Sequence, residues 1–153
     1  MSDVTAHGSG PRPIVVGIDG SDESRDALHY ALDEGVLRSL PVHAVTAWTP
    51  PDLWVTTHGV VTSAAEMQHA AREATTAFVD AVTADRTARG AANPDVSVEV
   101  HDGPPAAVFE RLSAHAALLV VGHRGRGAIA SRMIGSVGLS CIVHARCTVV
   151  VVR

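Results

Sequence analysis

Glycine and arginine dominate the segment that follows an apolar run near the end of the chain. Residues 120–138 read VVGHRGRGAIASRMIGSVG, and between the apolar run and Ser136 glycines lie at positions 122, 125, 127 and 135. Glycine lets a ligand reach the main chain, and successive exposed N–H groups form a nest that binds anions. Arg124, Arg126 and Arg132 supply positive charge. The segment therefore predicts a phosphate-binding loop; a surface loop that the glycines merely turn is the competing interpretation.

A helix is expected directly after this loop, which favours the phosphate-binding interpretation. The pattern predicts a helix over 136–145. The N-terminus of a helix offers free N–H groups and the positive end of the helix dipole to an anion. Ser136 either caps this helix or offers its hydroxyl to a phosphate oxygen.

Other motifs are excluded because the residues they require are missing. The chain has no lysine, so it can build neither a P-loop nor a Schiff base. Gly125, Gly127 and Ala130 fit GxGxxA, but a dinucleotide site places that loop after the first strand and before an acidic residue. Here the loop follows the fourth apolar run and no acidic residue lies beyond it, which excludes NAD. Neither GxSxG nor HExxH occurs, and the histidines form no close cluster.

Strand-like runs alternate with helical patterns along the chain. The apolar runs are 14–18, 43–47, 96–100, 117–121 and 148–152. The helical patterns are 22–38 behind a Ser21 cap, 64–83 behind a Ser63–Glu66 capping box, a short helix opened by Pro104 and Pro105, and 136–145. This alternation predicts βαβ units and a mostly parallel sheet. Only the run VSVEV at 96–100 alternates in polarity, so it is placed at an edge.

Composition favours one small domain without nucleic-acid or membrane partners. The 153 residues suit a single core, and the net charge of −4 gives no basic surface. No segment approaches the ~20 apolar residues of a membrane span. Residues 1–12 are expected to be a disordered leader before a domain at 13–153. Cys141 and Cys147 are expected to be reduced, as in a cytoplasmic protein.

Several motifs together resemble one family. Gly122, Gly125, Gly135 and Ser136 fit the spacing G-x2-G-x9-G-[S/T], which resembles the ATP-binding members of the universal stress protein family. The opening IVVGIDGSDESRDAL and the stretch HDGPPAAVFERLSAHAALLVVGHRGRG also look like that family. The resemblance covers residues 13–153. It implies an open, Rossmann-like α/β fold, a five-stranded parallel sheet of order 3-2-1-4-5 with helices on both faces.

The resemblance also implies a ligand and the residues that hold it. ATP, with Mg²⁺ or Mn²⁺ bound mostly through its phosphates, is the implied ligand. Asp19 would contact the nucleotide and Ala47 would pack on adenine, with the glycine loop holding the phosphates. The implied binding residues are Gly17, Ile18, Asp19, Ala47, Val121, Gly122, His123, Arg124, Gly125, Gly135, Ser136 and Val137. His123 departs from the family's usual serine or threonine; it reaches a phosphate or faces solvent.

The resulting expectation is a cytoplasmic ATP-binding regulatory module in stress response. The resemblance implies a homodimer through strand 148–152 and regulatory protein partners that the sequence does not identify. No nucleophile or general base is placed, so no enzyme is expected beyond slow ATP hydrolysis. A slow hydrolase and a nucleotide-free interaction module are the alternatives. Asp102 is expected to cap the short helix, and Trp48 and Trp54 to anchor a long loop at 48–62.

Overall fold

The structure is a computed structural model that describes residues 10–49, 63–125 and 134–153. Its five strands form one parallel sheet in the order β3-β2-β1-β4-β5. The strands are β1 (Ile14–Gly17), β2 (Val42–Trp48), β3 (Val96–Asp102), β4 (Leu118–Gly122) and β5 (Thr148–Val152). The helices are α1 (Asp22–Arg38), α2 (Ala64–Ala88), α3 (Pro105–Ser113) and α4 (Ser136–His144). The fold class and strand order predicted from the sequence are confirmed.

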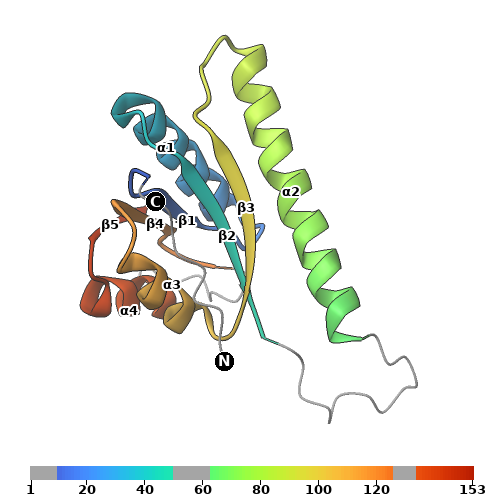
Figure 1. Cartoon of the computed structure of the whole chain (residues 1–153), viewed down its shortest axis with the longest axis vertical. Coiled ribbons are helices and arrows are strands. Elements are labelled where there is room, and N and C mark those ends of the chain that lie inside the picture. Colours follow the sequence, from blue (N-terminus) through green and yellow to red (C-terminus); the bar gives the residue numbers. More distant parts are fainter. Residues whose placement is uncertain (1–9, 50–62, 126–133) are drawn as a thin grey trace.

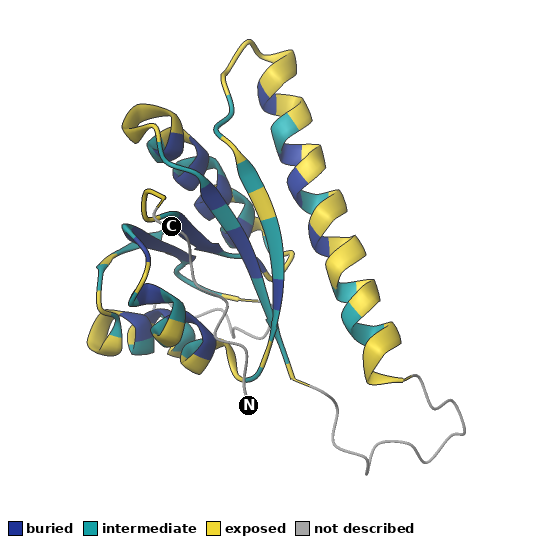
Figure 2. Ribbon diagram, in the orientation of Figure 1, coloured by how far each residue is buried: buried dark blue, intermediate teal, exposed yellow. Residues whose placement is uncertain are grey.

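Helices cover both faces of the sheet (Figure 1). Ile14 and Val16 of β1 point into a core formed with α1 and α2. Val15, between them, points the other way into a core formed with α3 and α4. Because successive side chains of a strand alternate between faces, a strand covered on both sides needs a continuous apolar run. Figure 2 shows the buried residues gathered along the strands and the helix faces that meet them.

The helix starts largely follow the predicted caps. The Ser21 hydroxyl accepts from the N–H of Ser24 at 3.1 Å, and α1 begins at the next residue, Asp22. Ser63 and Glu66 form the predicted capping box at the start of α2. Each cap satisfies main-chain N–H groups that have no partner within the helix.

The helix α2 is longer than predicted because a tertiary contact extends it. The pattern predicted 64–83, whereas α2 runs to Ala88. Arg86 in its last turn is buried, 7% exposed, and donates to Asp33 of α1 at 2.7 Å. Arg86 also donates to the side chain of Asn93 at 3.0 Å and to the carbonyl of Ala92 at 3.1 Å. These bonds stabilise the last turn of α2, and the periodicity of the sequence could not predict them.

Two predictions, for Asp102 and for Trp48, are wrong because both residues lie at the carboxyl ends of strands. Both strands run past the predicted limits, to Trp48 and Asp102, which pair across the sheet. The Trp48 indole N–H donates to the Asp102 carboxylate. Asp102 is therefore not the cap of α3, as was predicted; Pro104 occupies the N-cap position and Pro105 is the first helical residue. Trp48 belongs to a strand rather than to a loop.

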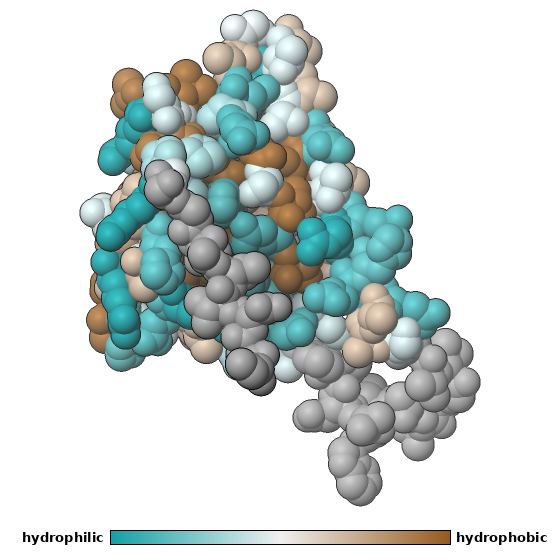
Figure 3. All heavy atoms as spheres, viewed as in Figure 1, coloured by the Kyte–Doolittle hydropathy of each residue, from teal (hydrophilic) through white to brown (hydrophobic). Residues whose placement is uncertain are grey.

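The two edge strands are β3 and β5, as predicted. Arg72 of α2 donates to the carbonyl of Val98 on β3 at 3.1 Å, which ties this edge strand to the helix. Beside β5, the helix α4 exposes three large apolar side chains: Leu139, Ile142 and Val143. Figure 3 shows hydrophobic side chains reaching the surface at the left edge of the molecule, where α4 lies.

Some predictions fall on residues that the structure does not describe. These are the leader at 1–9, the loop at 50–62 with Trp54, and residues 126–133, which include Arg126, Gly127, Ala130 and Arg132. Among the described helices, none is long and apolar enough to cross a membrane.

Candidate functional site

A cavity of about 440 Å³ opens at the carboxyl ends of β1 and β4. The strand order reverses between these two neighbours, since β2 follows β1 on one side and β5 follows β4 on the other. Ligands of open α/β sheets bind in the crevice at such a reversal. The sequence had selected a set of residues that all line this one cavity: Gly17, Ile18, Asp19, Ala47, Val121, Gly122, His123, Arg124, Gly125, Gly135, Ser136 and Val137.

The segment after β1 fixes the position of the Asp19 carboxylate. The Ile18 N–H donates to the carbonyl of Val45 at 2.8 Å, which continues the sheet to the residue before Asp19. Both the main-chain N–H of Ser21, at 2.9 Å, and its hydroxyl donate to Asp19 Oδ1. Gly20 between them has φ +79°, a conformation that suits glycine. The turn therefore holds one carboxylate oxygen at Ser21.

The glycines of the loop after β4 are packed against other elements. A Cβ on Gly122 would lie 2.9–3.0 Å from atoms of Glu23, in the first turn of α1. A Cβ on Gly125 would lie 2.7 Å from Asp19 Oδ2. Both distances are shorter than real Cβ contacts, so these two positions admit only glycine without a local shift. Glycine here allows close approach of the backbone across the crevice.

Main-chain hydrogen bonds fix both ends of the glycine loop. The His123 N–H donates to the carbonyl of Val152 on β5 at 2.8 Å. The Gly135 N–H, just before α4, donates to the carbonyl of His123 at 2.7 Å. The start of α4 is thereby held beside the end of β4, and both border the same cavity.

The start of α4 carries no side-chain cap. Gly135 is its N-cap, and Ser136 is the first helical residue. The prediction that α4 begins at Ser136 is confirmed, but the option that Ser136 caps it is wrong. An N-cap residue is extended, and Gly135, at φ −67° and ψ 160°, takes that conformation in place of Ser136. Since no side chain of the described residues caps the first turn by a hydrogen bond, its free N–H groups can bind an anion.

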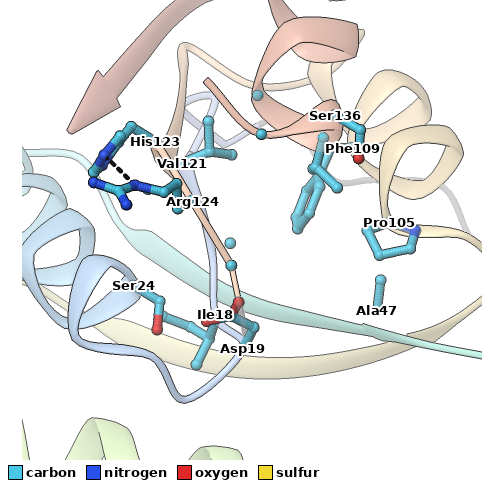
Figure 4. A pocket seen from close by; sticks show the side chains of 16 residues that line it. Ile18, Asp19, Ser24, Ala47, Pro105, Phe109, Val121, His123, Arg124 and Ser136 are labelled. Carbon is cyan, nitrogen blue, oxygen red and sulfur yellow. Dashed lines mark hydrogen bonds between the residues drawn. The ribbon is translucent and has the colours of Figure 1, made fainter. Parts of the chain in front are cut away.

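One end of the cavity is apolar. Pro105 and Phe109, one helical turn apart on α3, line it together with Ala47 of β2 (Figure 4). The ring of Phe109 lies against the main chain of β1, because a Cβ on Gly17 would be 2.9 Å from Phe109 Cζ. Figure 4 shows Ala47 and Pro105 on the opposite side of the cavity from His123 and Arg124.

Sequence reasoning missed four lining residues: Ser24, Pro105, Phe109 and Gly138. The spacing of Pro105 and Phe109, four apart at the start of a helix that follows a strand end, was a signal that could have found them. Ser24 and Gly138 left no comparable signal. Both are buried in helices, and only the packing of the fold brings them to the cavity.

His123 and Arg124 interact with each other at the polar end of the cavity. The Arg124 Nε–H donates to His123 Nε2 at 2.7 Å (Figure 4). The other ring nitrogen, His123 Nδ1, is buried and has no hydrogen-bond partner in the described part of the chain. The sequence left two interpretations of His123 open, contact with a phosphate or exposure to solvent. In the structure the ring accepts a hydrogen bond from Arg124.

The described residues offer neither a metal-binding cluster nor a reactive thiol. Within 10–49, 63–125 and 134–153 no group of three His, Cys, Asp or Glu side chains could hold a metal ion. Both cysteines are free, and burial raises the pKa of the Cys141 thiol to about 11. A thiol with a raised pKa is a poor nucleophile at neutral pH.

Comparison with characterised sequences identifies curated relatives over nearly the whole chain. The universal stress protein Rv2028c of Mycobacterium tuberculosis strain H37Rv is 33% identical over 143 residues, which are 94% of this chain and 48% of the relative. Rv2623 of the same strain is 34% identical over 145 residues, covering 92% of this chain and 45% of the relative. The chain thus spans about half the length of the curated relatives it matches.

Solved structures share the fold. A universal stress protein in complex with cAMP is 25% identical with a TM-score of 0.64, and the match covers 93% of this chain and 97% of that one. A universal stress protein from Archaeoglobus fulgidus in complex with dAMP is 23% identical with a TM-score of 0.58, covering 92% and 97%. The sequence model of the universal stress protein family matches residues 11–153. The chain belongs to the universal stress protein family.

Proposed function

We propose that this chain binds ATP in the cavity between β1 and β4 and acts as a regulatory module in stress response. The observation that carries the proposal is that every residue selected from the sequence lines this single cavity. Its volume of about 440 Å³ lies in the range of small-molecule sites, ~300–1,000 Å³. The bound cAMP and dAMP of the two related structures make an adenine nucleotide the expected class of ligand.

The division of the cavity suggests how the nucleotide lies. The apolar end at Ala47 and Pro105 suits a base, and the polar end suits phosphates. Arg124 borders the polar end, and the glycine loop and the N-terminus of α4 line the same cavity. A helix N-terminus and a guanidinium both favour negative charge, so the phosphates would lie against them.

The donor set fits a metal ion only together with phosphates. Asp19 is the only acidic side chain among the described lining residues. Mg²⁺ and Mn²⁺ prefer oxygen ligands, and one carboxylate is too few to hold either ion alone. We therefore expect Mg²⁺ or Mn²⁺ to arrive with ATP, bound mainly through phosphate oxygens.

Binding rather than catalysis is the proposed activity. Among the described lining residues, the Ser24 hydroxyl donates to the carbonyl of Ser21, and His123 accepts from Arg124. The Ser21 hydroxyl, which does not line the cavity, donates to Asp19, whereas no described lining hydroxyl is hydrogen-bonded to a base in the manner of an activated nucleophile. A cytoplasmic regulator, responding to nucleotide and contacting protein partners, is consistent with such a site.

Isothermal titration calorimetry with ATP tests the proposal. Wild-type protein is expected to bind one ATP per chain and to return it unhydrolysed over the titration. Gly135→Val puts a branched side chain on the N-cap of α4, where its Cβ makes an ordinary contact with the His123 carbonyl at 3.4 Å; by covering the free N–H groups of the first turn it is expected to weaken binding roughly tenfold or more. Gly10→Val, where no atom lies within 4 Å, is the matched control.

Other outcomes of this titration would support the alternatives. Formation of ADP at many turnovers per second would make the chain a hydrolase. Absence of binding to ATP, ADP and AMP would leave a nucleotide-free interaction module. Equal ATP affinity in wild type and Gly135→Val would place the site elsewhere.

We further propose that two copies of the chain associate through β5 and α4. The order of the sheet leaves one edge of β5 without a neighbouring strand in the described fold. Next to it, Leu139, Ile142 and Val143 are 52%, 53% and 64% exposed. An apolar edge strand beside exposed apolar side chains favours association, and a second copy offers the same surface in return.

Sedimentation equilibrium tests the dimer. Ile142→Glu is expected to give a monomer, because two carboxylates would be buried at the interface. Leu37→Glu changes an exposed apolar residue at the end of α1, 78% exposed, and is expected to remain a dimer. A monomeric wild type, or a dimeric Ile142→Glu variant, would contradict the proposed interface.

A further inference from the structure

The only described side-chain cation of the cavity is engaged with a neutral partner. Arg124 donates its Nε–H to His123 Nε2 at 2.7 Å and makes no ion pair within the described residues. A guanidinium forms its strongest hydrogen bonds with carboxylates and phosphates, and an imidazole nitrogen carries no charge to match it. An incoming phosphate is therefore a better acceptor for Arg124 than His123 is.

This hydrogen bond fixes the protonation of the imidazole. Since Nε2 accepts from Arg124, it carries no proton, and a neutral ring must then carry its proton on Nδ1. His123 Nδ1 is buried without a partner among the described residues. A buried N–H with no acceptor is unfavourable. The His123–Arg124 hydrogen bond therefore leaves the Nδ1–H in an unfavourable state, and turning the ring to reach an acceptor would remove this penalty.

We propose that His123 restrains Arg124 in the free protein and that proton uptake by His123 releases Arg124 to the nucleotide phosphates. This inference rests on the proposed nucleotide function and adds a regulation to it. A protonated ring has a hydrogen on Nε2 and cannot accept from Arg124, and the two cations then repel each other. A phosphate between them accepts from both, so nucleotide binding and proton binding favour one another.

The surrounding charges decide whether such coupling is strong. Asp19 lines the same cavity from the turn after β1, close to Gly125, and Glu23 lies where α1 packs against Gly122. The elements around the ring carry these charged groups: Asp19, Glu23, Arg124 and Arg153, the last directly after the Val152 carbonyl that binds the His123 N–H. Neither Asp19 nor Glu23 is hydrogen-bonded to the imidazole in the described contacts.

Nucleotide affinity measured against pH tests the coupling. Histidine titrates between about pH 5 and pH 8, so ATP, AMP and adenosine are titrated into the protein at about pH 8 and pH 6. ATP affinity of the wild type is expected to rise at the lower pH by at least about fivefold more than that of His123→Gln. The glutamine side chain can accept from Arg124 but cannot take up a proton. Adenosine, which has no phosphate, should show no such difference.

The variants also separate the two proposals. The phosphate of the ligand itself titrates near pH 6, and His123→Gln retains that contribution, so the difference between the two proteins isolates the ring. Calorimetry in buffers of different ionisation enthalpy should show more protons taken up on ATP binding by the wild type. Arg124→Gln should bind ATP weakly at both pH values and adenosine as well as the wild type does.

The outcomes are distinguishable. If ATP binds and the wild type and His123→Gln respond equally to pH, the coupling is overturned while the nucleotide function stands. If Arg124→Gln binds ATP as tightly as the wild type, Arg124 is not the phosphate ligand and the coupling is again overturned. If no protein binds any of the three ligands at either pH, both proposals fall.

Discussion

The carboxylate of Asp19 lies against the main chain of Gly125, so closely that a Cβ on Gly125 would come within 2.7 Å of Asp19 Oδ2. The first residue follows β1 and the second follows β4, the two strands between which the sheet order reverses. Contact across this crevice brings the acidic turn and the glycine loop together at one cavity.

Gly125→Ala is expected to weaken ATP binding with little loss of stability. The added methyl group must push the loop away from Asp19 Oδ2, and the carboxylate cannot yield freely because Ser21 holds its other oxygen. Gly125 is exposed, so the free energy of unfolding should change by less than about 0.5 kcal/mol. Calorimetry and urea unfolding check the two effects. ATP affinity equal to that of the wild type would contradict the close approach.

Gly17→Ala is expected to destabilise the fold by about 1–3 kcal/mol, as overpacking of a core does. Its Cβ would lie 2.9 Å from Phe109 Cζ, and the ring is buried between α3 and the sheet. Phe109→Leu should recover part of the loss when the two changes are combined. Urea unfolding of the single and double variants measures this, and additive losses would show that the ring and Gly17 do not compete for space.

Arg86→Leu is expected to cost about 1–3 kcal/mol of unfolding free energy. The change leaves the Asn93 side chain and the Ala92 carbonyl without their donor at the buried end of α2. Arg89→Leu is the matched control, because Arg89, directly after α2, is 77% exposed and its ion pair among the described contacts is a local one with Asp85. If both variants unfold at the same urea concentration, the Arg86 contacts do not stabilise the helix end.

Three partly exposed side chains of β2 and β3, those of His43, Glu99 and His101, predict a pH dependence of stability. A hydrogen bond from His43, and a weaker effect of His101, lower the pKa of Glu99 from 4.5 to about 2. A carboxyl group with a lowered folded-state pKa stabilises the protein above pH 4.5, and this stabilisation is lost as the pH falls towards 2. The advantage of the wild type over Glu99→Gln should therefore shrink between pH 5 and pH 3.

The size of that effect is limited by solvent. The Glu99 side chain is 32% exposed, so screening keeps its contribution to about 1 kcal/mol. Urea unfolding at each pH measures it. Glu73→Gln is the control, since Glu73 and its partner His69 are about 70% exposed and should contribute nothing measurable. A Glu99→Gln variant that matches the wild type at neutral pH would refute the prediction.

The glycine loop and the alternation of strands and helices could be predicted from patterns local in the chain, whereas the strand order was implied by the resemblance to the family. Gly122, Gly125 and Gly135 mark a loop at fixed spacing, and the alternation of 96–100 marks an edge strand. The cap positions could not be predicted as well. Ser136 and Asp102 are both good caps by residue type. Ser136 is instead the first helical residue, because Gly135 has the extended N-cap conformation, and Asp102 is the last residue of β3, where it pairs with β2.

The remaining misses depend on contacts between distant elements. Phe109 lines the cavity because α3 packs over the end of β1, and Arg86 extends α2 because Asp33 of α1 lies beside it. The Arg86 contact leaves no periodic signal in the chain, and Phe109 is marked only by its four-residue spacing from Pro105. Tertiary packing overrides local propensity at these positions, as it commonly does.

The most direct test of the account is the set of amide resonances that shift when ATP and Mg²⁺ are added to uniformly ¹⁵N-labelled protein. The account predicts that the largest shifts fall on two segments far apart in the sequence, residues 17–19 and residues 121–125, together with 135–137 at the start of α4. Saturating shifts confined to other surfaces, or no shifts at millimolar ATP, would contradict it.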